Sequence, residues 1–137
     1  MIVARNSVLG VWGIGHQFIS VIYSDDLVEN WQIGEVICRD GDLINGIGIT
    51  NPSETVAVQK SDKTIMFKLR TESSPKRRLI ATNEDGVSDF KIEGFHESLL
   101  EPVCMGSLVR YNNSDTTEGI SYFLLTSIPW RKQNGDT

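Results

Sequence analysis

The stretch TVAVQ-KSDK-TIMFKL, residues 55 to 69, decides the fold class. Residues 55–59 and 64–69 are rich in β-branched and aromatic side chains, which favour extended strands. Between them, residues 60–63 form a short polar segment of the kind that closes a hairpin. The stretch therefore predicts two antiparallel strands joined by a four-residue turn.

The segments on either side of this hairpin repeat its pattern. Further strands are predicted at 18–23, 31–37, 77–82, 90–92, 107–111 and 121–126, with polar turns such as Asp40-Gly41-Asp42 between them. No long stretch has the apolar spacing of a helix, and only residues 98–100 are expected to form a helical turn. Short strands with frequent turns predict an all-β domain, either a sandwich, a barrel or a propeller.

Composition excludes several classes of protein. The 137 residues carry 13 Lys and Arg against 18 Asp and Glu, a formal net charge of −5, and 39% are hydrophobic. This is the balance of a globular chain, and an acidic pI near 5.0 argues against nucleic acid as a partner. No apolar run is long enough for a membrane-spanning helix, so no membrane partner is expected. The first residues do not resemble a signal peptide, and the compartment stays open.

The sequence offers no metal site. Cys38, Cys104, His16 and His96 do not lie at the spacing of metal ligands. We expect no metal and no cofactor. The two cysteines are expected to be buried free thiols, with a single disulfide between them as the alternative.

Two polar turns followed by an aromatic residue form a repeat. The first is SDDLVENW, residues 24–31, which resembles the Asp-box S-x-D-x-G-x-T-W of sialidase-type β-propellers, and a weaker copy is TNEDGVSDF, residues 82–90, with one extra residue before its aromatic. The acidic side chain of such a box caps backbone N–H groups of the turn. The copies are separated by about the length of one propeller blade. We expect Trp31 and Phe90 to occupy equivalent positions, each packed against its sheet.

Four further segments resemble a bacterial exo-α-sialidase, in that family's order and spacing. They are ETVAVQKSD (54–62), TIMFKLR (64–70), RRLIA (77–81) and EPVCMGSL (101–108), and the resemblance is strongest from residue 23 to residue 111. It implies that residues 1–137 are a partial sialidase-type domain, about two to three blades of a six-bladed β-propeller built of antiparallel hairpins and sheets. Lys63 and Val28 replace turn glycines of the family, which predicts different backbone angles there.

The resemblance also implies a site for the terminal sialic acids of glycoconjugates. Glu54 matches the carboxylate that draws the proton from a tyrosine nucleophile, and Arg70 matches one of three arginines that clamp the sugar carboxylate. An arginine suits that role because its planar fork donates two parallel hydrogen bonds. Arg131 is a second clamp candidate, and Met105, in place of a glutamine, would border the pocket. We expect the Arg70 guanidinium to face an open pocket near Glu54 with few internal partners.

Two catalytic groups of the family have no match in this sequence. Tyr23, Tyr111 and Tyr122 fit no nucleophile motif, and no segment fits the Asp acid/base. We therefore expect a fragment that is catalytically incomplete on its own. A decayed sialidase relative, or a subunit that completes its ring by assembly, would look the same. Open propeller edges would permit self-association.

Two other functional classes stay open at this stage. One is a non-catalytic sialic-acid-binding protein, and the other is a structural Asp-box repeat protein. In the structural case, Glu54 and Arg70 would point apart or contact only local partners.

Overall fold

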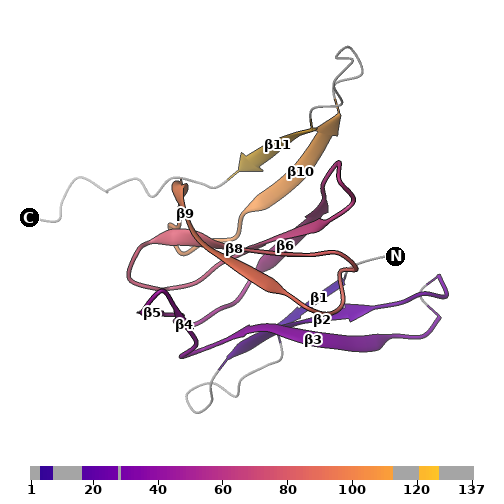
Figure 1. The fold of residues 1–137 in the computed structure, drawn as a ribbon, viewed down its shortest axis with the longest axis horizontal. Helices are drawn as coiled ribbons and strands as arrows, with labels where there is room; N and C mark the ends of the chain where they lie inside the picture. Colours follow the sequence, from indigo (N-terminus) through magenta and orange to yellow (C-terminus); the bar gives the residue numbers. More distant parts are fainter. Residues whose placement is uncertain (1–3, 8–16, 28, 113–120, 127–137) are drawn as a thin grey trace, which may run out of the picture.

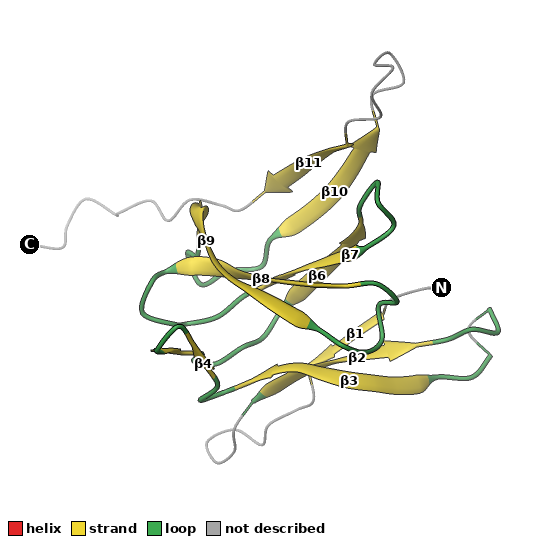
Figure 2. Cartoon of the chain, viewed as in Figure 1, coloured by secondary structure: helices red, strands yellow, loops and turns green. Residues whose placement is uncertain are grey.

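The chain folds into small antiparallel β-sheets (Figure 1). The computed structural model describes residues 4–7, 17–27, 29–112 and 121–126. Within these residues every regular element is a strand, as Figure 2 shows. The predicted all-β class is therefore confirmed.

Strands that are neighbours in sequence are also neighbours in a sheet. The first sheet has the order β1 (Ala4–Ser7), β2 (Phe18–Tyr23), β3 (Gln32–Arg39). The second has four strands, β6 (Thr55–Gln59), β7 (Ile65–Leu69), β8 (Arg77–Asn83) and β9 (Lys91–Leu100). The remaining strands form two pairs, β4 (Leu43–Ile44) with β5 (Ile47–Gly48) and β10 (Ser107–Asn112) with β11 (Ser121–Thr126).

Most predicted strands agree with the observed ones to within two residues, but one prediction was wrong. Residues 98–100 are the end of β9 and not a helical turn, because Leu100 pairs with Arg77 of β8. Partner strands thus override a weak local preference. Strand β1 was not predicted, since its four residues ARNS lack any apolar alternation.

The hydrophobic core joins the first sheet to the second. Ile19, Val21 and Ile37 come from β2 and β3, while Phe67 and Leu79 come from β7 and β8. All five side chains are buried. The core thus lies between the two sheets, which face one another in Figure 1.

Both Asp-box-like turns are capped by an aspartate. Asp26 Oδ1 accepts hydrogen bonds from Ser24 Oγ (2.8 Å) and the Asn30 amide (2.9 Å). Asp85 Oδ1 accepts them from the amides of Val87 (2.7 Å) and Ser88 (2.9 Å). These bonds lower the pKa of Asp26 to about 2, with the Asn30 amide as the largest cause. The expected capping of backbone N–H groups is confirmed.

The two turns are more alike than the sequence comparison indicated. Asn83 donates to Asp85 as Ser24 donates to Asp26, so Asn83 and not Thr82 is the equivalent of Ser24. With this register, no extra residue precedes the second aromatic. Trp31 and Phe90 then fall at the same position, each one residue before a strand.

The two aromatics differ in packing. The Phe90 ring is half-buried and meets Phe67 edge-on, with ring centroids 5.3 Å apart. Trp31 keeps 46% of its surface exposed, so the packing expected of both rings holds for Phe90 and is at most partial for Trp31.

The second turn docks directly on the first sheet. The Glu35 amide donates to the Val87 carbonyl (2.9 Å), and the Asp89 amide donates to Glu35 Oε2 (2.9 Å). A Cβ on Gly34 would lie 2.7 Å from the Val87 oxygen, closer than real Cβ atoms approach. Glycine at position 34 is what allows this contact between sheets.

The β6–β7 turn adopts the backbone of a glycine turn without a glycine. Lys63 has φ of +72°, so the prediction of different angles at this position was wrong. The turn is closed by the Lys60 amide on the Thr64 carbonyl, 2.8 Å apart. Val28, the other substituted position, lies outside the described residues.

Replacing Lys63 with glycine is expected to stabilise the chain. An L-residue with positive φ is strained by about 1 kcal/mol, and glycine relieves this strain. Part of the gain is lost because glycine also gives the unfolded chain more conformational freedom. Urea unfolding should show a gain of about 0.5 kcal/mol in the free energy of unfolding. Ser61→Gly, at a position without positive φ, is the control and should destabilise or be neutral. A loss of stability in Lys63→Gly would contradict the strain.

Candidate functional site

Strand pairing brings Glu54 and Arg70 together. Glu54 immediately precedes β6 and Arg70 immediately follows β7, and Thr55 pairs with Leu69 in the antiparallel register. The Arg70 amide donates to the Glu54 carbonyl at 3.0 Å. The hairpin predicted from sequence therefore places both predicted site residues at its open end.

The two side chains form an ion pair. Arg70 Nε lies 3.6 Å from Glu54 Oε2, and Arg70 is only 18% exposed. Both of these atoms are buried, and neither has a hydrogen-bond partner in the described residues. A guanidinium N–H and a carboxylate oxygen thus meet side by side with unused hydrogen-bonding capacity.

Arg70 also contacts three other residues. Its Nη1 donates to Ser53 Oγ (2.6 Å), and its Nη2 donates to the Val103 carbonyl (3.3 Å) and lies 3.6 Å from Glu72 Oε1. The expectation of few internal partners was therefore wrong. The reason is that residues 53 and 72 lie beside the paired ends of β6 and β7, within reach of the guanidinium.

A buried charged cluster lies beside this pair, and the sequence analysis gave it no role. Arg78 Nη1 lies 2.9 Å from Glu101 Oε2, with both side chains essentially unexposed. Arg78 Nη2 donates to the Cys104 carbonyl (2.6 Å), and Lys68 Nζ donates to the Ser107 carbonyl (3.1 Å). The cluster ties residues 101–107 to strands β7 and β8.

Burial shifts the pKa values within this cluster. The pKa of Lys68 falls to about 8, first because burial disfavours its charged form and then because Arg78 repels it. Burial also raises the pKa of Glu101, and the neighbouring Arg78 opposes that rise. The sequence signal for the cluster was a lysine inside the apolar run TIMFKL and an arginine pair at the start of β8.

The other predicted site residues fare differently. Met105 is 65% exposed on the segment that contacts Arg70, two residues after Val103. Arg131 lies outside the described residues. Cys38 is buried and Cys104 is half-buried, and no disulfide joins them, so the disulfide alternative is not formed.

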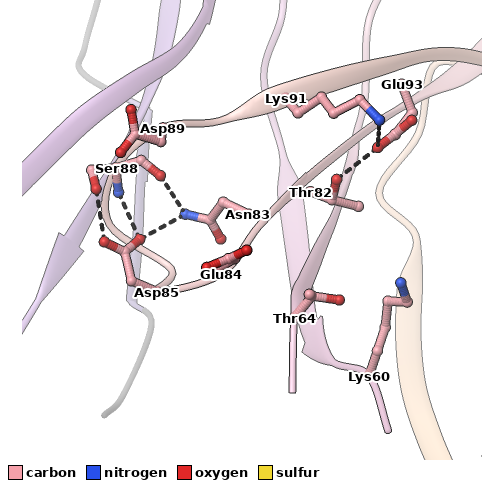
Figure 3. Close-up of a pocket in the computed structure, with 10 residues that line it drawn as sticks. All are labelled: Lys60, Thr64, Thr82, Asn83, Glu84, Asp85, Ser88, Asp89, Lys91 and Glu93. Atoms are coloured by element: carbon pink, nitrogen blue, oxygen red, sulfur yellow. Dashed lines mark hydrogen bonds and ion pairs between the residues drawn. The ribbon is translucent and has the colours of Figure 1, made fainter. Parts of the chain in front are cut away.

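One cavity of about 470 Å³ opens at the opposite end of the second sheet (Figure 3). Its charged lining residues are Lys60, Lys91, Glu84, Asp85, Asp89 and Glu93. Asp85 is committed to its turn, and Glu93 accepts from Thr82 and pairs with Lys91, as the dashed lines of Figure 3 show. These two carboxylates therefore serve local structure.

A second cavity, of about 280 Å³, lies between the sheets. It is lined mainly by core residues of β2, β6 and β7 and by Ser107 and Leu108 of β10. It reaches Thr55, the neighbour of Glu54, but Glu54 and Arg70 do not line it. The predicted open pocket at Arg70 is thus not among these cavities.

Within the described residues, no group of three or more His, Cys, Asp or Glu is placed to hold a metal ion. The same part of the chain contains no helix long and apolar enough to cross a membrane.

No family model matches the chain, and no curated protein matches its sequence significantly.

The buried Lys68 should make stability depend on pH. Its pKa is about 8 in the folded chain against 10.5 for the ordinary lysine, so the unfolded chain binds more protons between these values. Stability should therefore rise as pH increases, by about 1 kcal/mol between pH 7.5 and 9. Cys38, whose pKa is raised to about 12, acts in the opposite direction above pH 9.

This rise is measured as the free energy of unfolding in urea at the two pH values. Lys68→Met should abolish the rise, whereas Lys91→Met, at an exposed lysine, should retain it. An equal rise in the Lys68→Met variant would show that another group is responsible.

Proposed function

We propose that this chain is part of a sialidase-type β-propeller whose Glu54–Arg70 pair serves a site for terminal sialic acids. The observation that carries the proposal is the contact of 3.6 Å between Arg70 Nε and Glu54 Oε2, two buried atoms without a hydrogen-bond partner in the described residues. The resemblance to the exo-α-sialidase family assigns these same two residues to substrate binding and catalysis.

The arrangement of the sheets supports the propeller. The sheets follow one another in chain order, and each Asp-box-like turn joins the last two strands of its sheet, β2 to β3 and β8 to β9. Equivalent turns at equivalent places are what a repeated blade would produce.

The chemistry of sialic acid fits the pair. Its carboxylate needs a cation with a planar fork, which Arg70 supplies once the exposed Glu72 carboxylate swings away. Glu54 would accept the proton of a tyrosine nucleophile, because a phenol with a pKa near 10 attacks poorly at neutral pH without a neighbouring base. Sialidases use such a tyrosine in place of a second carboxylate.

A second candidate function is a non-catalytic sialic-acid-binding or structural Asp-box repeat protein. The contacts of Arg70 with Ser53, Glu72 and Val103 favour the structural alternative, since an arginine held by internal partners needs no ligand. Binding of a sialoside by the chain separates the structural alternative from the other two.

Arg70→Lys is expected to weaken binding of the methyl α-glycoside of N-acetylneuraminic acid by about tenfold or more, because an ammonium cannot form the bidentate contact. Binding is followed by chemical-shift changes in NMR titrations. Arg77→Lys, at a neighbouring arginine that contacts only backbone carbonyls in the described residues, is the matched control and should bind like the parent chain.

The methyl ester of the same glycoside tests the role of the carboxylate. The parent chain should bind the ester weakly. Its affinity for the ester should be no higher than the affinity of Arg70→Lys for the free acid. Equal binding of ester and acid would show that the sugar carboxylate is not recognised. Unchanged binding by Arg70→Lys would show that Arg70 does not bind the sugar.

The isolated chain is not expected to cleave sialosides. Of the tyrosine, glutamate and aspartate that the family's mechanism requires, only Glu54 has a match in this sequence. General acid–base assistance alone is worth about 10²–10⁴-fold, and without the nucleophile the covalent route is lost as well. A fluorogenic sialoside assay on the purified chain should show no turnover. Turnover that disappears in Glu54→Gln would contradict the incompleteness and would still support the site.

A further inference from the structure

Val103 has a backbone conformation that its side chain disfavours. Its φ is +59°, in the left-handed region, where a β-branched residue is a strong outlier. The side chain is 39% exposed, so its own burial does little to offset the strain. Such strain persists only where surrounding contacts enforce it, and it concentrates at functional sites.

Three contacts hold the backbone around Val103. Glu101 Oε1 accepts the Val103 amide at 2.7 Å, and the Glu101 amide donates to the Lys76 carbonyl at 3.0 Å. On the other side, Arg78 Nη2 donates to the Cys104 carbonyl at 2.6 Å. Arg78 and Glu101 are themselves joined at 2.9 Å, so one buried ion pair grips the chain before and after Val103.

The backbone conformation of Val103 affects Arg70 through the Val103 carbonyl oxygen. The Val103 carbonyl accepts a hydrogen bond from Arg70 Nη2 at 3.3 Å. The guanidinium is thereby held between this carbonyl, Ser53 and Glu54. If Val103 relaxed to a negative φ, its carbonyl would turn and this bond would be lost.

We propose that Arg78 and Glu101 are positioning residues for Arg70, which act by clamping Val103 in its left-handed conformation. The proposal rests on the proposed function only in taking Arg70 as a ligand-binding residue. A buried ion pair is weak evidence for stability, because apolar residues of similar volume often replace it without loss. A positioning role would explain why a buried ion pair, and not two apolar side chains, occupies these positions.

The test separates positioning from stability with two variants. Arg78→Met combined with Glu101→Leu removes both charges of the clamp together, so neither is left buried without its partner and the fold is expected to survive. Glu101→Gln keeps an oxygen for the Val103 amide but loses the ion pair, so stability falls while Arg70 stays in place. Arg77→Met, on the same strand and outside the cluster, is the control.

Two readouts are taken on each variant. The first is the set of ¹⁵N–¹H signals of the Arg70 guanidinium, identified by their absence in Arg70→Lys, which reports positioning without any ligand. The second is the affinity for the methyl α-glycoside of N-acetylneuraminic acid. In the double variant Arg78→Met with Glu101→Leu, called the apolar pair, the separate N–H signals of the Arg70 guanidinium should merge into averaged ones. Binding should weaken by about tenfold, since a side chain that is not held in place must be ordered on binding. Glu101→Gln and Arg77→Met should stay within about twofold of the parent chain.

The decisive experiment adds Val103→Gly to the apolar pair. Glycine adopts positive φ without strain and needs no clamp, so adding Val103→Gly to the apolar pair should restore both readouts. A merely structural ion pair would not be replaced by a glycine at another position. Failure of this rescue, or unchanged Arg70 signals in the apolar pair, would overturn the proposal.

Two further outcomes are interpretable. If the apolar pair does not fold, Arg78→Lys is used: it keeps the buried charge but lacks the fork that holds the Cys104 carbonyl, and unchanged Arg70 signals would then overturn the proposal. If the parent chain binds no sialoside while the Arg70 signals respond as expected, the positioning holds and the proposed function fails.

Discussion

The buried contact of Arg78 with Glu101 fixes the path of the chain where it leaves the second sheet. Strand β8 contributes the arginine, and the glutamate begins the segment that leads to β10. Both charges are removed from water, so separating them would leave an uncompensated ion in the interior, at a cost of about 3–5 kcal/mol. The segment of residues 101–107 therefore has little freedom, and Lys68 holds its far end through the Ser107 carbonyl.

This constraint connects the scaffold to the candidate site. Arg70 lies at the end of β7, and its guanidinium meets the clamped segment at the Val103 carbonyl and the hairpin partner at Glu54. The site is thus built from the open ends of two paired strands and one held loop. Sites supported by regular elements keep their geometry better than sites made of loops alone.

Much of this arrangement follows from local sequence. The hairpin of residues 55–69 was predicted from alternation and a polar turn, and its register alone makes Glu54 and Arg70 neighbours. The Asp-box-like turns were recognised from a few residues, because an aspartate caps backbone amides within its own turn. Interactions between residues close in sequence leave a signal that a single chain can reveal.

Other features escaped because they depend on residues far apart in sequence. The positive φ of Val103 escaped because the clamp needs Arg78 of β8 as well as the nearby Glu101. The end of β9 was mistaken for a helical turn because its partner Arg77 lies 23 residues earlier. The register of the second turn escaped for a different reason: Asn83 lies only two residues from Asp85, but an asparagine stands where the Asp-box has a serine.

The sequence by itself determined the all-β class, the hairpin that pairs Glu54 with Arg70 and the two aspartate-capped turns, because hydrogen bonds and side-chain alternation within short segments encode them. Only the tertiary structure decided which partners surround Arg70, how Arg78 and Glu101 restrain Val103, and how the second turn reaches Gly34 of the first sheet. Those contacts arise when distant segments are brought together and desolvated, and the energies of buried charge and close backbone approach exist only in that packed state.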